Sequence, residues 1–137
     1  MKAFSIGCIC LLTACAGPRT VASPLPDFTF LEVARNPVNF DGKVVTVRGW
    51  ITVRDEDKNL WATWEDHEKW RTPQCISLIH YDLLRGSEKA LDGRYVEIRG
   101  VLRADASKQG NVIRPASCRD PGIEIADRSS IKILPSK

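Results

Sequence analysis

The segment "LWATWEDHEKWR", residues 60–71, holds the densest group of side chains that could bind a ligand. Its tryptophans alternate with acidic and basic residues, and an exposed tryptophan ring can stack on a sugar ring, an aromatic group or a base. Ordinary packing is the alternative. We favour packing for Trp64, which would share a strand face with Leu60 and Ala62, and both alternatives stay open elsewhere. The candidate ligand-binding residues of this segment are Trp61, Trp70, Lys69 and Arg71.

Catalytic chemistry is poorly supported by the same segment. Asp66, His67 and Glu68 are adjacent, and adjacent residues of a strand point to opposite faces, so they would converge only if a loop folded them together. His80 is the only other histidine. A metal site of both histidines and a carboxylate is geometrically possible, but no ligand spacing selects it. Ser77 is not part of a G-x-S-x-G motif. We therefore expect no catalytic site, no metal and no cofactor.

The N-terminal residues have the pattern of an export signal. Lys2 gives a positive start, and Ala3 to Thr13 form an apolar run too short to span a bilayer. The run ends in "LTAC", which resembles the lipobox of bacterial lipoproteins. By that resemblance residues 1–14 are a signal peptide, and Cys15 becomes the lipidated first residue that anchors the chain to a membrane. An ordinary cleaved signal, or a cytosolic chain with an apolar start, is the alternative.

The lipidated cysteine and the residues after it, 15–27, are expected to form an extended tether. They contain three prolines and several small residues, which favour an extended and flexible chain. Ala16 stands where lipoproteins retained in the inner membrane usually have Asp, so we expect the outer membrane, on its periplasmic side. The remaining residues, 28–137, have the usual size of one domain.

Only two cysteines remain outside the signal and the lipidation site, Cys75 and Cys118. Exported proteins fold in an oxidising compartment, so we predict that they form a disulfide. A crosslink that closes a loop of this length would stabilise the domain by roughly 4 kcal/mol in the chain-entropy account. Two separate buried thiols are the alternative. The absence of a C-x-x-C motif argues against a redox or metal role.

The pattern of apolar residues and turns predicts a strand-rich domain. A short helix is expected at 28–36, with Asp27 as its N-cap and Pro37 preventing its continuation. A polar hairpin loop is expected at 54–59. The long polar segment 103–128 is expected to be a loop with room for a short strand at 111–114. The five expected strands are 43–53, 60–66, 74–81, 94–102 and 129–134, with a weak helix at 82–91 between the third and the fourth.

Two strands begin with related motifs, "DGKVVTVRG" at 41–49 and "DGRYVEIRG" at 92–100. They do not indicate a tandem repeat, because the segment at 60–66 has no counterpart after the second motif. A closed barrel needs strongly bent strands, and we expect Gly49 and Gly100 to lie at the bends.

With a helix between strands three and four, this order resembles the bacterial OB-fold modules of the anticodon-binding-like group. The segments that carry the resemblance are "NPVNFDGKVVTVRGWI", "NLWATWED", "CISL" and "LDGRYVEIRGVL". The resemblance implies an all-β, β-dominated domain: a five-stranded OB-fold barrel with an N-terminal helix. It also implies ligand contact at the outer face of strands two and three and at the neighbouring loops.

Arg48 and Arg99 each precede a predicted bend, and the fold does not explain them. We treat both as candidate ligand-binding residues of a charged surface, to which Arg54 and Arg103 could add. Solvated strand faces are the alternative.

The function expected from these features is a non-enzymatic, lipid-anchored OB-fold module of the bacterial cell envelope that binds an envelope protein or a glycan. The alternative is an OB domain that binds single-stranded nucleic acid. Nucleic acid is not the expected partner, because 20 basic side chains against 17 acidic ones give no large excess of positive charge.

Overall fold

The computed structural model of the chain describes residues 28–109 and 118–135. The predicted signal peptide, Cys15, the tether with Asp27 and the suggested strand at 111–114 lie outside these ranges. The described helices are α1 (Phe30–Arg35), α2 (Trp64–Glu68) and α3 (Glu88–Leu91). The described strands are β1 (Val44–Arg54), β2 (Asp57–Trp61), β3 (Cys75–Ile79), β4 (Arg94–Arg103), β5 (Gly122–Glu124) and β6 (Ile131–Ile133).

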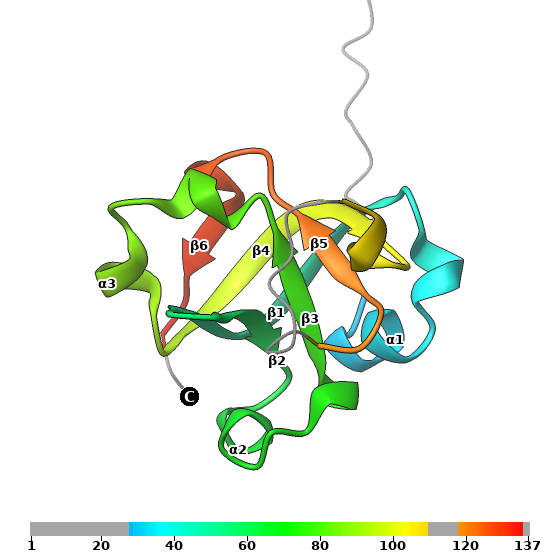
Figure 1. Cartoon of the computed structure of the whole chain (residues 1–137), viewed down its shortest axis with the longest axis horizontal. Coiled ribbons are helices and arrows are strands. Elements are labelled where there is room, and N and C mark those ends of the chain that lie inside the picture. Colours follow the sequence, from blue (N-terminus) through cyan, green and yellow to red (C-terminus); the bar gives the residue numbers. More distant parts are fainter. Residues whose placement is uncertain (1–27, 110–117, 136–137) are drawn as a thin grey trace, which may run out of the picture.

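Five of the strands close into a barrel in the order β1-β2-β3-β5-β4, with β4 pairing back onto β1. All of these pairs are antiparallel except β3 with β5, which are parallel. Figure 1 shows α1 and α3 at opposite sides of the barrel. This is a β-dominated, OB-like barrel, and it confirms the predicted fold class, the N-terminal helix and the helix between strands three and four.

The fifth strand of the barrel is not the predicted one. Residues 131–133 form β6, an additional strand that pairs with the edge of β4. The strand that closes the barrel is β5, which lies in the segment predicted as a loop. It is only three residues long and begins with Gly122, where a Cβ atom would lie 2.7 Å from the side chains of both Ala106 and Ile79. This position therefore requires glycine. Because a strand of three residues that starts with glycine has the composition of a loop, the sequence did not predict it.

The predicted second strand is also shifted. β2 begins at Asp57, directly after a tight turn at Asp55 and Glu56, and it ends at Trp61. The residues that follow form α2 because Thr63 caps it: the Thr63 hydroxyl oxygen accepts a hydrogen bond from the Asp66 backbone N–H at 3.1 Å. The predicted loop and strand are thus a turn, a shorter strand and a helix.

Helix α1 begins with a capping box rather than at Asp27. The Thr29 hydroxyl oxygen accepts from the Glu32 N–H, and the Glu32 carboxylate accepts from the Thr29 hydroxyl at 2.7 Å and from its N–H at 2.8 Å. These hydrogen bonds, chiefly that from the hydroxyl, lower the pKa of Glu32. The cap directs Phe30 and Val33 toward the barrel, where both are buried.

The two related motifs pair with each other in the antiparallel ribbon of β1 and β4. Val47 lies opposite Ile98, and these two residues occupy the same place in the two motifs. The motifs are therefore related by an approximate local twofold axis that passes through this pair. The similarity is one device used twice within a single barrel, as predicted.

The Asp-Gly pairs make equivalent hydrogen bonds on the two sides of this axis. Gly42 and Gly93 adopt left-handed backbone conformations, with φ of 72° and 69°. Each aspartate carboxylate accepts a hydrogen bond from a backbone N–H that lies four residues after the glycine, Gly49 or Gly100, of the other strand. The four bonds are Gly42 N–H to Leu102 O (2.8 Å), Gly93 N–H to Ile51 O (2.9 Å), Ala104 N–H to Asp41 Oδ1 (2.8 Å) and Val53 N–H to Asp92 Oδ1 (3.0 Å).

Gly49 and Gly100 permit close approach of a third strand on each side. A Cβ atom at Gly49 would lie 2.5 Å from the carbonyl oxygen of Trp61 in β2, and one at Gly100 would lie 2.5 Å from that of Glu124 in β5. Because each long strand pairs with two neighbours, these two contacts let β1 and β4 belong to both sides of the barrel. The structure thus shows that each long strand serves two sides of the barrel at its glycine.

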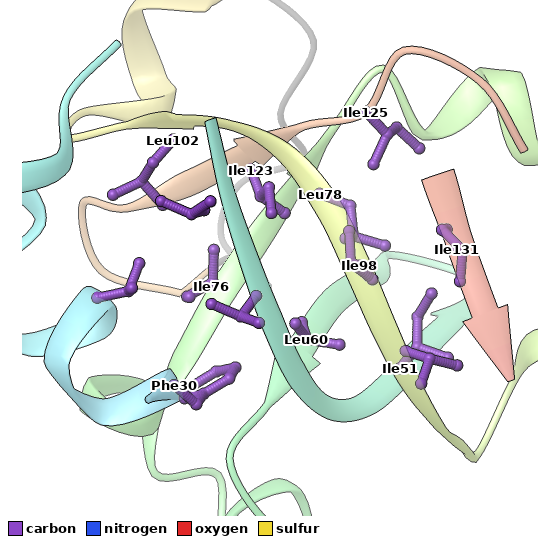
Figure 2. Packing of buried hydrophobic residues seen from close by; sticks show 14 of the residues in the cluster. Phe30, Ile51, Leu60, Ile76, Leu78, Ile98, Leu102, Ile123, Ile125 and Ile131 are labelled. Atoms are coloured by element: carbon purple, nitrogen blue, oxygen red, sulfur yellow. The ribbon is translucent and has the colours of Figure 1, made fainter. Parts of the chain in front are cut away.

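The barrel encloses one apolar core that runs from α1 to the opposite end (Figure 2). Phe30 lies at the α1 end, and Ile51 and Ile131 lie at the other. Leu84, in the segment between β3 and α3, and Leu91, at the end of α3, are also buried in this core.

A disulfide joins Cys75 to Cys118, with 5.4 Å between their Cα atoms, as predicted. Together with Trp61 it forms a second buried apolar cluster, against which Trp50 packs. The bond fastens the chain just before β5 to the first residue of β3, so it helps to hold the short closing strand in place.

The glycine contacts predict a ranking of two substitutions. Gly100→Ala should lower the free energy of unfolding more than Gly42→Ala, because the new Cβ atom at Gly100 meets the backbone of β5. No atom lies within 4 Å of a Cβ atom at Gly42, so only left-handed backbone strain of about 1 kcal/mol is expected there. Urea unfolding of both variants tests this, and an equal or smaller loss for Gly100→Ala would contradict it.

Candidate functional site

The segment 60–71 folds into the end of β2, the helix α2 and a left-handed turn. This arrangement brings Trp64 against Trp50 of β1, and Trp50 in turn contacts Tyr95 of β4, which lies opposite it in the ribbon. The ring centroids of Trp64 and His67 are 4.5 Å apart, and those of Trp50 and Trp64 are 5.8 Å apart. We call the whole group the aromatic cluster: Trp50, Trp61, Trp64, His67, Trp70 and Tyr95.

Trp61 is the buried member of the cluster. Its side chain is completely inaccessible, and its indole N–H donates to the Thr52 hydroxyl at 3.0 Å. It also packs on the disulfide. Of the two alternatives for Trp61, the structure favours packing.

Trp64 packs, but not on a strand face. It is the first residue of α2 and is partly buried between His67 and Trp50. Its indole N–H donates to the Glu68 carboxylate at 3.1 Å. The helix therefore explains its position, and the predicted strand partners do not.

Trp70 is the member of the cluster that reaches the surface, with 45% of its area exposed. It lies 5.1 Å from Trp61, centroid to centroid, so its ring rests on a buried one. Its backbone is left-handed, with φ of 49°, and this conformation ends α2. The Trp70 N–H donates to the His67 carbonyl at 3.0 Å and the Arg71 N–H donates to the Asp66 carbonyl at 2.8 Å, which is a Schellman motif.

The position that Trp70 occupies in this motif is usually glycine. A bulky residue is strained there, at a cost of roughly 1 kcal/mol. Strained backbone tends to persist at binding and catalytic sites. An exposed tryptophan that is held in this conformation is consequently a candidate contact residue.

The two candidate cations beside Trp70 have acidic partners on the same segment. Lys69 pairs with Glu65 at 2.5 Å, and Arg71 pairs with Asp66 at 3.1 Å and with Glu65 at 3.3 Å. The hydrogen bond and charge of Lys69, followed by the charge of Arg71, lower the pKa of Glu65. Both cations beside Trp70 are therefore engaged by acidic side chains of the same segment.

His67 connects the aromatic cluster to a polar hollow. Its Nε2 lies 2.9 Å from the Asp57 carboxylate, which also accepts from the Thr52 hydroxyl at 2.7 Å. The hollow has a volume of about 390 Å³ and is bordered by Trp64 and by Arg54, which pairs with Asp92. It offers hydrogen-bonding groups and an aromatic wall, and His67 links it to Trp70, whose ring centroid is 6.3 Å from that of His67.

The histidines do not form a shared site. His67 faces Asp57, whereas His80 lies 3.4 Å from Glu124 on another strand. Within residues 28–109 and 118–135, no three His, Cys, Asp or Glu side chains form a group that could hold a metal ion. Ser77 is buried in β3.

The outer face of β2 and β3, where the resemblance places ligand contact, is not open in this chain. Leu60 and Ile76 point into the barrel, so their neighbours Trp61 and Cys75 point outward, and both are nevertheless buried. Cys118 lies over them and is buried with them. The candidate contact surface is therefore shifted from the strand face to α2 and the turn after it.

Arg48 and Arg99 project from the same outer face of the β1 and β4 ribbon, at equivalent places in the two motifs. Arg48 pairs with Glu97 at 2.8 Å, whereas Arg99 lies opposite Thr46. The other two arginines also have acidic partners, since Arg54 pairs with Asp92 and Arg103 pairs with Glu124. The predicted basic stripe is thus largely neutralised by ion pairs.

Sequence reasoning identified the Trp-rich segment but missed three members of the cluster. Trp50 and Tyr95 become neighbours only through the register of two strands that are distant in sequence. His67 was considered only as a metal ligand or a catalytic residue. The T-x-x-D sequence of Thr63 to Asp66 was the signal that could have revealed α2 and therefore the position of His67.

Comparison with protein-family models, with curated proteins and with solved structures finds no match in any of the three. Across the described part of the chain, no helix is long and apolar enough to cross a membrane.

The left-handed position of Trp70 predicts an inverted order of stability for two variants. Trp70→Gly and Trp70→Ala both remove the ring, but glycine accepts the backbone conformation and alanine does not. We expect Trp70→Gly to be more stable than Trp70→Ala by about 1 kcal/mol, although glycine usually destabilises relative to alanine. Urea unfolding measures the difference, and a more stable Trp70→Ala variant would contradict the assigned strain.

Proposed function

We propose that this protein is a non-enzymatic, lipid-anchored OB-like module of the bacterial cell envelope, and that it binds an envelope glycan at the aromatic cluster. The observation that carries the proposal is Trp70: an exposed ring, supported from below by Trp61 and kept in a strained backbone conformation. An exposed indole that stacks on a sugar ring needs such fixed support, because a mobile side chain would lose conformational entropy on binding.

The polar groups next to Trp70 are suited to a hydroxyl-rich ligand. Asp57, Thr52 and His67 line the adjoining hollow with hydrogen-bond acceptors and donors, and the carboxylates of α2 extend this surface. Sugar hydroxyls can both donate to carboxylates and accept from neutral donors. Aromatic rings with a few polar groups are also the usual composition of small-molecule sites.

The same charges argue against the nucleic-acid alternative. Binding to a phosphate backbone depends on clustered, available Lys and Arg side chains. Lys69 and Arg71 are already paired with Glu65 and Asp66, so both cations beside Trp70 are engaged. The phosphate of a stacked base would have to compete with these carboxylates for the two cations.

The proposed envelope location rests on the lipobox-like "LTAC" and its Cys15. A triacylated cysteine would give stable anchoring, since a single acyl chain holds a protein only marginally. The tether at 15–27 would then set the distance between the membrane and the barrel.

Glycan binding can be tested by sedimentation of the purified full chain with peptidoglycan sacculi. We expect the wild type to co-sediment and Trp70→Gly to lose most of this binding while it remains folded. Leu83→Ala is the control, because Leu83 is also 45% exposed but belongs to the turn Tyr81–Leu84, outside both the aromatic cluster and the lining of the hollow.

Retention of binding by Trp70→Gly would contradict the site. If the chain does not bind sacculi and crosslinking in intact envelopes captures a protein through Trp70, the partner is a protein and not a glycan. Salt-sensitive binding to a single-stranded oligonucleotide would instead favour the nucleic-acid alternative.

Lipid anchoring predicts a processing defect in Cys15→Ala. Without the thiol, the diacylglycerol cannot be attached and the signal should stay uncut, so the variant should migrate as the longer precursor on a gel. Metabolic labelling with a fatty acid should label the wild type alone. A Cys15→Ala variant that is processed and labelled like the wild type would contradict the assignment.

A further inference from the structure

A second groove lies on the outer side of β4, between β1 and the segment that leads into β6. Its volume is about 470 Å³. Three carboxylates and two cations line it, together with the half-buried Ser130. The charged residues are Glu97, Glu124, Asp127, Arg99 and Lys132.

Each carboxylate of this groove is already engaged. Glu97 is bound by Arg48 at 2.8 Å and Glu124 by Arg103 at 2.7 Å. Asp127 accepts from the hydroxyl and N–H of Ser129 and from the N–H of Ser130, and the hydroxyl bond is the main cause of its lowered pKa.

The two cations of the groove are in the opposite situation. Arg99 and Lys132 are both exposed, and neither side chain makes an ion pair or hydrogen bond within the described part of the chain. Lys132 of β6 lies opposite Glu97 of β4, and Arg99 is two residues after Glu97 on the same strand. Lys132 and Arg99 are therefore diagonal neighbours, which lie about 7 Å apart in antiparallel sheets. A single anionic group placed between them could contact both.

The local twofold axis explains why Arg99 lacks an acid. The equivalent of Arg99 in the other motif is Arg48, which has Glu97 directly across the ribbon. The residue across from Arg99 is Thr46, and Thr46 is itself the equivalent of Glu97. A single difference between two otherwise similar motifs therefore leaves one arginine with a carboxylate partner and the other without one.

We propose that this groove binds a phosphate group, with Arg99 and Lys132 as the cationic contacts and the Ser130 hydroxyl as a neutral donor. Arginine presents a planar pair of N–H groups that matches phosphate oxygens, and lysine adds a point charge. The groove lies at the other end of the β1 and β4 ribbon from Trp50 and Tyr95, so it is separate from the proposed glycan site and does not depend on it.

The test uses the purified full chain in neutral maltoside micelles. Inorganic phosphate is titrated at constant ionic strength while NMR follows the Arg99 side-chain N–H and the Ser130 backbone N–H. We expect saturable shifts in the wild type. Thr46→Glu supplies the carboxylate that Glu97 supplies to Arg48, and it should raise the dissociation constant about tenfold or more, the effect of losing one charged contact.

Arg99→Gln should have the same effect as Thr46→Glu, and Arg85→Gln is the matched control because it removes an exposed arginine outside the groove. Urea unfolding confirms that each variant is folded. Equal phosphate affinity in the wild type and in both groove variants would overturn the proposal, as would the absence of saturable shifts with every phosphate probe.

A parallel titration distinguishes the source of the phosphate group. Lysophosphatidylglycerol is added to the micelles in place of inorganic phosphate, with lysophosphatidylcholine as the neutral comparison. Shifts at Arg99 with inorganic phosphate identify a small phosphate ligand. Shifts that need lysophosphatidylglycerol, and that Thr46→Glu abolishes, identify a lipid headgroup.

Discussion

The antiparallel ribbon of β1 and β4 is the element on which the rest of the structure depends. An Asp-Gly turn precedes each strand. The glycine N–H of each turn donates to a carbonyl oxygen of the other strand, and the aspartate carboxylate accepts from a backbone N–H near the end of that other strand. Since these groups act in pairs across a local twofold axis, they set the register of the ribbon at both ends. A slip of either strand by one residue would exchange the core and solvent faces of that strand.

The two sides of the barrel form where β2 pairs with β1 and β5 pairs with β4. Gly49 and Gly100 face inward and let β2 and β5 come near enough to pair. The outer face of the same ribbon carries the functional candidates. Trp50 and Tyr95 start the aromatic cluster at one end, and Arg99 lies toward the other. One register therefore positions both proposed sites.

The sequence was informative where local chemistry decides the structure. The repeated Asp-Gly and Arg-Gly pairs predicted two bent strands, and an isolated pair of cysteines predicted the disulfide. It was less informative where distant contacts decide. β5 is a three-residue parallel partner of β3 with a glycine at its start, so it has neither the length nor the alternation of a recognisable strand. The sequence predicted only part of the aromatic cluster, because Trp50 and Tyr95 become members of it through strand pairing.

The two proposed sites differ in which of their charged side chains form ion pairs, and this difference is physical evidence for separate ligands. Around Trp70 the cations are paired with acids from the same segment, which leaves an aromatic surface whose cations are already engaged. In the groove of β4 the acids are paired, which leaves Arg99 and Lys132 available. An anion at Trp70 would have to compete with carboxylates for cations that are already paired, and a neutral sugar in the groove would leave two cations without a counter-charge. One barrel could therefore hold a glycan and a phosphate group at once, and the two contacts would be independent.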